Sequence, residues 1–454
     1  MRLKARTRRG PMGIVLSASG APPTPASEEV ERLRREAFLL DGVTGLPVHP
    51  FEDPVRAARL EALEHFGVIY LQIGKFFGFE ELYGWEQYDR VLAVVAAGLR
   101  EDVAASRLAE ALVSLRFTGA DGFYLLFDLG SVGRARQAAV LEAEAARLRS
   151  NAVRRLRRTF GGTAVDLTSI HVSSLAASDN PRSRPSRHLM RLFAEAAQIV
   201  SQQQTSEQIQ LSAELKGVLG RKQLRAVFQP VCRLSDAGVA GYEALIRGPA
   251  GTSLETPNAL FAVARENALD VELESLCLET IFRRLPGAVG RQRLFINASA
   301  TLLRHPVFLD ERNLAAINRR HSDVVVEISE KEMVGDYAAF REILAVLRRS
   351  NLLIAIDDAG SGYSGLEAIL YLRPDYIKVA DSLVRGLESD PIKREIITSL
   401  ATIGRRIGAD VIAEGIERRQ ERRALIDLGI ELGQGFLLGR PSFQAGRSRA
   451  PAGQ

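Results

Sequence analysis

Six apolar stretches in the second half of the sequence carry a polar or charged residue inside the run or at its end. These residues are the acids Glu243, Glu327, Asp357, Asp358 and Glu414, together with Asn297 and Lys378. Burying a carboxylate without a partner is costly, and two neighbouring carboxylates repel each other. The segment IAIDDAGSGYS (354–364) concentrates this problem, because two adjacent aspartates end its apolar run. Converging carboxylates need a cation, and all-oxygen ligands suit Mg²⁺ or Mn²⁺ better than zinc.

Two divalent ions in such a site would suit phosphoryl chemistry. Each ion lowers the pKa of bound water and holds phosphoryl oxygens, so the residue set predicts a phosphodiester hydrolase with a two-metal site. A single buried glutamate would be explained as a satisfied structural group. Acids on several successive strands are much harder to explain in that way.

These side chains can meet only if their strands end at one rim. We expect strands at 225–234, 240–248, 293–299, 323–330, 352–358, 376–381 and 410–416, with an eighth at 431–439, and helices between several of them, such as 337–349 and 392–408. Alternating strands and helices predict a parallel sheet covered by helices. The fold class is therefore α/β, with a C-terminal TIM-like (β/α)8 barrel whose strand ends form the active rim. An open, doubly wound sheet is the alternative.

The first half predicts a separate α/β domain. Strands are expected at 67–73, 123–129 and 165–174, with helices around 91–99 and up to about Arg158. A loop at 177–187 precedes one long helix or two over 188–219, and we place the junction near Gln204. The expected plan is a disordered tail and entry helix at 1–40, a domain at 41–204, the barrel domain at 205–445 and a tail at 446–454.

Composition excludes several classes of protein. The chain has 454 residues, is 46% hydrophobic and carries a net charge of +5, which argues against a disordered protein and against a nucleic-acid polymer as partner. Cys232 and Cys277 form no CxxC pair and are expected to be reduced, buried thiols in the cytoplasm. We find no apolar run that would form a transmembrane segment and no signal-peptide core.

Seven strings in the second half carry a family resemblance. They are YEALIRG (242–248), INAS (296–299), EISE (327–330), DDAGSGYSG (357–365), IKVAD (377–381), AEGIE (413–417) and QGFLLGRP (434–441). In this order they resemble the EAL family of cyclic di-GMP phosphodiesterases over residues 215–442. Any one string is weak, but seven in order are specific.

The resemblance implies a function and a role for each matching residue. Cyclic di-GMP would be hydrolysed to linear pGpG in bacterial second-messenger signalling, by a homodimer formed through the EAL domain. The first metal would bind Glu243, Asn297, Glu327 and Asp357, and the second metal or the attacking water would be held by Asp358 and Glu414. Lys378 would orient that water. Arg247 would contact a substrate phosphate, Gln434 would lie near the metals or the nucleotide, and Glu330 and Glu417 would organise the loop after Asp358.

Two departures from the family pattern bear on activity. Ala359 replaces the usual Phe after the paired aspartates, and Ala380 stands where the family has the Asp of its KxD motif. Asp381 comes one position late, and a one-residue shift would turn its side chain to the other face of the strand. We therefore treat that acid as missing and expect an active phosphodiesterase with a lowered rate.

The first half resembles a GGDEF domain, the diguanylate cyclase family, without its chemistry. DGVTGLP (41–47) resembles the domain entry, 67–92 the metal strand and its helix, and GADGF (119–123) the signature hairpin. The stretch with Gln72 and Gly74 lacks the metal-binding aspartate, and Gly122 replaces the signature acid. We expect no cyclase activity and a regulatory or dimerising role.

Two other functions remain open. A non-catalytic cyclic di-GMP receptor, acting through the degenerate domain and an unknown protein partner, would agree with Ala359 and Ala380. A barrel glycosidase would need only two carboxylates and would leave the Asn, the Lys and the other acids unexplained. Metal dependence separates the phosphodiesterase from the glycosidase, and loss of turnover in Glu243→Ala separates it from the receptor.

Overall fold

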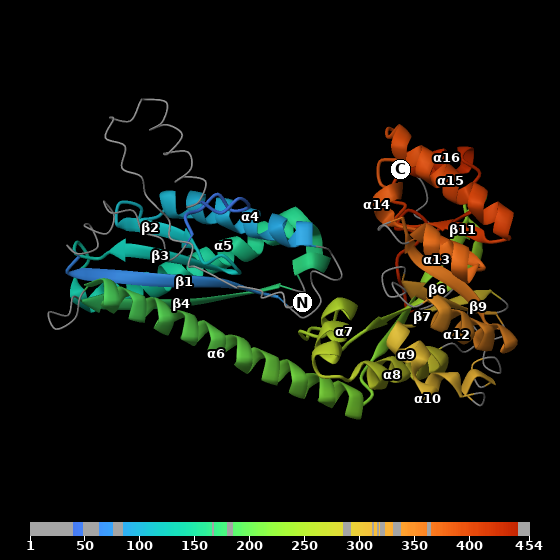
Figure 1. Ribbon diagram of the computed structural model, residues 1–454, viewed down its shortest axis with the longest axis horizontal. Coiled ribbons are helices and arrows are strands. Elements are labelled where there is room, and N and C mark those ends of the chain that lie inside the picture. The colour runs from blue at the N-terminus through green and yellow to red at the C-terminus, as the bar shows by residue number, and fades with distance from the viewer. Residues whose placement is uncertain are drawn as a thin grey trace, which may run out of the picture.

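The computed structural model describes residues 40–48, 63–75, 85–165, 168–178, 185–284, 292–310, 313–315, 317, 323–329, 337–360 and 365–443. The expected tail, nearly all of the entry helix, the C-terminal tail beyond 443 and Glu330 lie outside these residues. The described residues form a four-stranded sheet with helices and a closed barrel, which a long helix connects (Figure 1).

The first unit is built on an antiparallel sheet with the strand order β2-β3-β1-β4. Its strands are β1 (His65–Lys75), β2 (Leu112–Phe117), β3 (Gly122–Asp128) and β4 (Thr168–Ser178). The predicted signature string forms the turn between β2 and β3, where Thr118 N donates to Gly122 O at 2.9 Å. β2 was not predicted as a strand, and β4 begins later than expected because helix α5 runs on to Val165.

Helices cover both faces of this sheet. Alternate β1 residues Ile69, Leu71 and Ile73 pack with α4 (Trp85–Ala104) and α5 (Gln137–Val165). The intervening residues Phe66, Val68 and Tyr70 pack with α6 (Pro185–Gly220). A strand's period of two therefore explains why β1, apolar on both sides, is fully covered.

Helix α6 is one continuous helix of 36 residues that reaches both units. Its first part places Leu189, Phe193 and Val200 on the sheet. Its last part places Leu211 and Leu215 in the core of the barrel unit. Gln204, the expected junction, lies in the middle of this helix.

The second unit is a closed eight-stranded barrel, which rules out the open sheet. Around the barrel the strand order is β10-β11-β12-β5-β6-β7-β8-β9. The strands are β5 (Arg225–Arg233), β6 (Val239–Arg247), β7 (Arg293–Asn297), β8 (Val324–Ser329), β9 (Leu353–Ala359), β10 (Tyr376–Val379), β11 (Asp410–Ala413) and β12 (Leu432–Gly433). β5 runs antiparallel to β6 and β12, which corrects the expectation of a wholly parallel sheet.

The barrel has an outer ring of helices and two apolar layers. The helices are α7 (Pro257–Glu266), α8 (Asp270–Arg284), α9 (Ala300–Arg304), α10 (Pro306–Leu309), α12 (Tyr337–Arg349), α13 (Gly365–Leu372), α14 (Asp381–Val384), α15 (Pro391–Ile407) and α16 (Arg419–Asp427). Outward-facing strand residues such as Ile296, Val326 and Ile356 pack with them. Cys232 and Cys277 are free and buried, as the sequence predicts.

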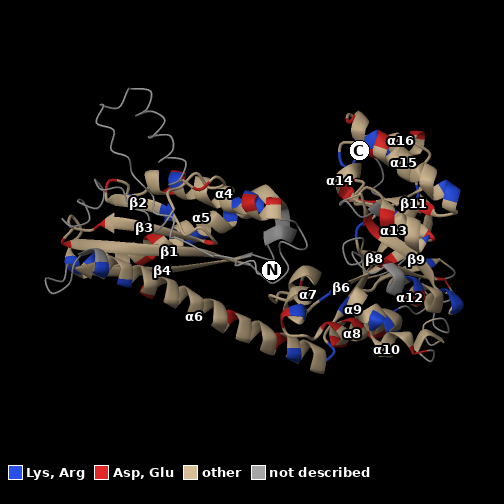
Figure 2. Ribbon diagram, in the orientation of Figure 1, with Lys and Arg blue, Asp and Glu red and all other residues tan. Residues whose placement is uncertain are grey.

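The structure also shows how charged residues are distributed and whether any helix could cross a membrane. Figure 2 shows basic and acidic residues intermingled over the described parts of both units. None of the described helices combines the length and the hydropathy that a membrane crossing needs.

Candidate active site

One layer of the barrel interior changes from apolar to polar. A small cluster fills the interior with Val231, Phe295, Val325, Ala355, Tyr376, Ile412 and Leu432. Two residues further along six of these strands, where the side chain faces inward again, stand Asn297, Glu327, Asp357, Lys378, Glu414 and Gln434. Register supports this layer, because Asn297 pairs with Glu327 across β7 and β8. The polar residues predicted from the strand ends therefore meet next to this apolar cluster.

Lys378 lies at the centre of the carboxylates. Its Nζ is 2.8 Å from Glu327 Oε1, 3.0 Å from Asp357 Oδ1 and 2.8 Å from Glu414 Oε1. Glu243 Oε2 lies further away, at 3.8 Å. Lys378 and Glu327 are each only 1% exposed, so water screens these charges little. Four carboxylates share one ammonium, and the layer keeps an excess of negative charge.

The pKa shifts follow from burial and from this excess. Burial raises the pKa of Glu327 well above its usual value, although Lys378 opposes the shift. Burial also raises the pKa of Glu414. For Lys378, burial alone would lower the pKa, but Asp357, Glu243 and Glu327 raise it well above the usual value. The lysine is therefore held as an ammonium ion by the acids around it.

Two amides orient the carboxylate of Glu243. Asn297 Nδ2 donates to Oε1 at 3.1 Å, and Gln434 Nε2 donates to Oε2 at 2.6 Å. The carbonyl oxygens of both amides are thereby directed away from Glu243, since an amide group presents its oxygen opposite its nitrogen. Gln434 Oε1 is buried and accepts no hydrogen bond from any described residue.

The layer fits a divalent metal in its chemistry. Both oxygens of Glu327 and Oδ1 of Asp357 are buried without a hydrogen bond of good geometry among the described residues. Such oxygens, with an Asn carbonyl, are the donors that Mg²⁺ and Mn²⁺ prefer. Within the described part of the chain, no three Asp, Glu, His or Cys side chains are arranged closely enough to hold an ion by themselves. Lys378 Nζ stands between the carboxylates instead.

The remaining predicted residues lie around this layer. Asp358 follows Asp357 with a left-handed φ of 57°, which breaks the strand alternation at the rim. Arg247, at the end of β6, donates to Ile246 O at 2.7 Å, and burial lowers its pKa. Glu417 lies half exposed, with a carboxylate oxygen 3.7 Å from the Arg385 guanidinium.

The two departures from the family pattern have clear positions. Ala359 is fully buried at the end of β9, and its side chain is part of the outer core. Ala380 is also buried, at the N-cap of α14. Asp381 lies 3.7 Å from Arg385, and its side chain is 61% exposed, so it does not reach the acid layer. This agrees with our expectation that the KxD acid is missing.

The structure adds residues that the sequence did not suggest. Gln229 of β5 pairs with Glu243 and is buried, with its Nε2 donating to Gly439 O at 3.1 Å. Because β5 is antiparallel, its first half lies at the rim where the other strands end. If β5 ran parallel to its neighbours, as we expected, Gln229 would lie toward the other end of the barrel, away from the polar layer.

A cavity of about 710 Å³ adjoins the polar layer. Glu243, Asn297 and Glu327 line its inner end, while Arg265 and Glu274 line its wall. Glu274 of α8 is buried and accepts hydrogen bonds from the backbone N (2.9 Å) and the hydroxyl of Ser299. Arg247, which was predicted to contact substrate, is not among the residues that line this cavity.

Comparison with known proteins identifies the family of the second unit. The model of the EAL domain family matches residues 212–441, about half of the chain. The chain belongs to the EAL domain family. This family is metal-dependent, in accord with the oxygen donors of the layer.

Relatives align with one or both units. The bifunctional diguanylate cyclase/cyclic di-GMP phosphodiesterase MucR of Pseudomonas aeruginosa is 27% identical over 442 residues, covering 90% of this chain and 62% of that protein. The probable cyclic di-GMP phosphodiesterase PdeG of Escherichia coli is 27% identical over 235 residues, covering 50% of this chain and 46% of its own length. A solved MucR phosphodiesterase in complex with c-di-GMP is 29% identical over 51% of this chain and 97% of its own, with a TM-score of 0.46.

Proposed function

We propose that this chain hydrolyses cyclic di-GMP to linear pGpG with the help of two Mg²⁺ or Mn²⁺ ions. The observation that carries the proposal is the layer in which Glu243, Glu327, Asp357 and Glu414 surround one ammonium. Several EAL relatives, among them MucR and PdeG, are named for cyclic di-GMP phosphodiesterase activity. A glycosidase would leave this excess of acids and the central lysine without a role.

Each residue of the layer has a distinct role in this proposal. Glu243, Asn297, Glu327 and Asp357 would hold the first ion, while Asp358 and Glu414 would hold the second ion or the attacking water. When bound, the ions supply an acidified water and charge neutralisation at the phosphate. Gln434 and Asn297 fix the carboxylate of Glu243 through their amide donors.

Lys378 has two tasks in the reaction. Its ammonium, kept protonated by the acids around it, donates hydrogen bonds to the attacking water and holds it toward phosphorus. It also offsets the negative charge that develops on the phosphoryl oxygens in the transition state. A preorganised charge in a site this deeply buried needs no rearrangement during the reaction.

The cavity beside the layer is the proposed substrate site. Its volume of about 710 Å³ falls in the range of small-molecule pockets. Arg265 on the wall supplies positive charge to a dinucleotide phosphate. Arg247, at the end of β6, is the second phosphate contact that the family resemblance implies. Glu330 and Glu417 would organise the loop that follows Asp358.

We propose that the first unit, residues 41–204, is a GGDEF-like domain without cyclase activity. A side chain at Gly122, where the family carries its acid, would overlap the ring of Tyr70. Tyr70 in turn stacks on Tyr124 with ring centres 4.5 Å apart. The space needed for a metal-binding acid is therefore filled by an aromatic pair, and a regulatory or dimerising role remains.

A homodimer through the barrel domain, residues 205–445, is part of the proposal. Leu366, Leu370 and Tyr371 are exposed on α13, with exposed fractions of 62%, 68% and 45%. Leu366 and Leu370 are one helical turn apart and lie on the same face. An apolar face of this kind suits contact with a second copy.

A non-catalytic receptor for cyclic di-GMP is the second candidate. The buried Ala380, with Asp381 turned to solvent, favours it, because the family acid beside Lys378 is absent. Such a receptor would bind the dinucleotide in the same cavity and release no product.

The test is turnover of cyclic di-GMP by the full chain with Mg²⁺ and then Mn²⁺, with pGpG followed by chromatography. Metal-dependent product that is lost in Glu243→Ala supports the enzyme. Glu266→Ala, a change on α7 outside the residues that line the cavity, is the matched control and should keep turnover. Dinucleotide binding without product in the unchanged chain would favour the receptor, and product that survives a chelator would contradict both.

A further inference from the structure

The interface between the first sheet and α6 changes from apolar to polar at one level. On the β1 face that α6 covers, Phe66, Val68 and Tyr70 are followed by Gln72 and Gly74. On β4, the partners of Gln72 and Gly74 are His171 and Ser169. On β4 the change comes one position earlier, at Ser173, which pairs with Tyr70 and donates to Ala196 O of α6 at 2.7 Å. From Gln72 and His171 onward, neither strand presents an apolar side chain to α6.

The face of α6 that packs on the two units changes at this level too. Its apolar residues recur at helical spacing as Leu189, Phe193, Ala196 and Val200, and then again from Leu211. Between these two runs the same spacing is occupied by Gln204, Glu207 and Gln208. Gln204 is half-buried, and Glu207 and Gln208 are exposed, so at this level α6 presents polar side chains to open space beside the sheet.

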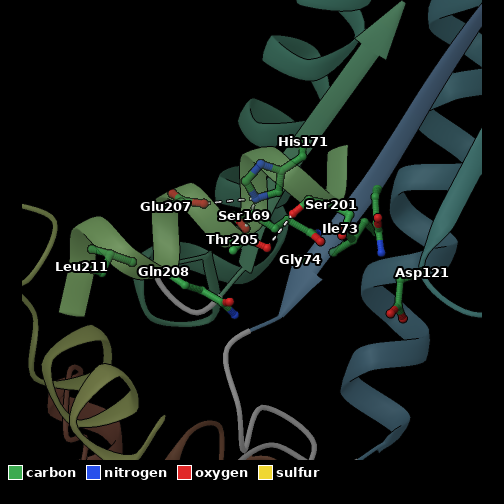
Figure 3. Close-up of a pocket in the computed structure, with 12 residues that line it drawn as sticks. Ile73, Gly74, Asp121, Ser169, His171, Ser201, Thr205, Glu207, Gln208 and Leu211 are labelled. Atoms are coloured by element: carbon green, nitrogen blue, oxygen red, sulfur yellow. Dashed lines mark hydrogen bonds and ion pairs between the residues drawn. The ribbon is translucent and has the colours of Figure 1, made fainter. Parts of the chain in front are cut away.

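These polar residues enclose a cavity of about 320 Å³ (Figure 3). His171 Nε2 lies 3.1 Å from Glu207 Oε2 and 2.7 Å from Ser169 Oγ, and Figure 3 shows the link between β4 and α6 that results. A side-chain carbon at Gly74 would be 2.5 Å from Ser169 Oγ, so glycine keeps this end open. Asp121 lines the opposite end from the side of the sheet that α4 covers, where it accepts a hydrogen bond from Tyr88 Oη at 2.7 Å.

The geometry excludes a serine hydrolase. Catalysis of that kind needs the serine on one ring nitrogen of the histidine and the carboxylate on the other. Here Ser169 and Glu207 both contact Nε2 of His171. The imidazole cannot pass a proton from one to the other through a single nitrogen.

The charges of the lining exclude an anion. Asp121 and Glu207 are its two carboxylates, and no Lys or Arg is among the described residues that line it. The hydrogen bond from His171 lowers the pKa of Glu207, so that this acid is ionised at neutral pH. Arg149 of α5 acts on Glu207 only from a distance, with its Nε donating to Ile170 O at 2.7 Å. A phosphate group would meet two carboxylates without a counter-ion.

We propose that this cavity binds a small organic cation, an amine of a few carbon atoms. Its ammonium groups would lie on Asp121 and Glu207, and its polar atoms on the amide of Gln204 and the hydroxyl of Ser201. The ligand would join the sheet to α6 at the point where α6 leaves the first unit for the barrel. The site is separate from the polar layer of the barrel, and the proposal does not depend on phosphodiesterase activity.

Three probes of equal length and different charge test the proposal on the full chain. They are 1,4-diaminobutane, 1,4-butanediol and succinate, titrated by calorimetry at about 0.15 M salt so that distant surface charges are screened. We expect the diamine to bind and the other two not to bind. Binding should weaken roughly tenfold or more in Glu207→Gln and in Asp121→Asn, because each removes a charge-assisted hydrogen bond. Glu195→Gln, an exposed acid on the same helix, is the matched control and should not change binding.

A further variant keeps the test valid if Glu207→Gln or Asp121→Asn fails to fold. Gln208→Arg adds a cation at the cavity wall without removing an acid, and should abolish diamine binding while the unfolding temperature stays near that of the unchanged chain. The proposal is overturned if the diol or succinate binds as well as the diamine, if no diamine binds, or if Glu195→Gln weakens binding as much as Glu207→Gln.

Discussion

Replacing Lys378 with Met removes the one ammonium that neutralises the polar layer. Methionine has a similar length and is apolar, so the change deletes the charge and leaves little empty space. Glu327, Asp357 and Glu414 then lose contacts of 2.8, 3.0 and 2.8 Å. Since Lys378 and Glu327 are almost fully buried, water cannot compensate for the loss. We expect the Lys378→Met barrel to be strongly destabilised when no divalent metal is present.

The size of the destabilisation can be worked out from the cost of breaking buried ion pairs in other proteins. Removing one partner of such a pair costs about 3–5 kcal/mol, because an uncompensated charge stays behind. For a unit of roughly 150–250 residues, 1 kcal/mol changes the unfolding temperature by about 2–4 °C. The barrel transition should therefore fall by about 6–20 °C in a chelator. Divalent ions should restore part of this loss, since a ligand at 100 times its Kd adds about 2.7 kcal/mol.

Scanning calorimetry of the full chain, with a chelator and then with Mg²⁺ or Mn²⁺, measures both effects. Lys222→Met is the matched control, because Lys222 forms an exposed ion pair with Glu279 at 2.8 Å, with side chains 54% and 43% exposed. Exposed pairs contribute about 0–1 kcal/mol, so this variant should change little. If Lys378→Met unfolds at the same temperature as Lys222→Met in chelator, or if metal stabilises it no more than the unchanged chain, the charge argument is refuted.

Three further substitutions test the surroundings of the site. Glu274→Ala leaves the backbone N–H of Ser299 without its acceptor, and denaturant unfolding should show a loss of about 1–3 kcal/mol; a change below half of that would contradict the role of this bond. Ala380→Asp returns the family acid and should raise kcat several-fold, whereas an unchanged or lower kcat in a folded variant would show that neighbours already compensate. Burial alone would raise the pKa of Glu421, but hydrogen bonds from the Glu417 and Arg418 backbone lower it below 4.5. The contribution of Glu421 to the stability of the folded chain is therefore complete above about pH 4.5. It is lost as the pH falls through the lower pKa of the folded state. Glu421→Gln should thus lower the unfolding temperature at pH 7 and lose less on acidification than the unchanged chain, and equal acid sensitivity of the two would contradict the assignment.

The barrel was predictable because its signal is repeated. Each strand has an apolar run, and in most of them one polar residue follows an inward-facing apolar residue at a spacing of two. Phe295 and Asn297, or Val325 and Glu327, show this pattern directly in the sequence. Because the ends of the strands were expected to converge on one rim, the residues that meet there could be named without coordinates.

The direction of a strand and the contacts between residues far apart in the sequence could not be predicted. Nothing in the apolar run of β5 distinguishes an antiparallel strand from a parallel one, and Gln229 was missed for that reason. Strand β2, LVSLRF, pairs through a hairpin that the sequence indicates only by its turn. The contact between Glu274 and Ser299 joins α8 to the start of α9, and no local spacing links them.

The position of Lys378 shows that divalent metal is not the only group that can neutralise the acids of the polar layer. From the sequence, divalent metal was the expected partner of Asp357 and its neighbours. In the structure, one ammonium contacts three of the acids, yet buried oxygens on Glu327 and Asp357 are left without hydrogen bonds of good geometry. Burial also raises the pKa of Glu327 and Glu414, so the ammonium and proton uptake together lower the charge of the layer. The oxygens without hydrogen bonds are still available to a cation. Lys378 therefore does for the unloaded barrel part of what the divalent ions would do for the loaded one.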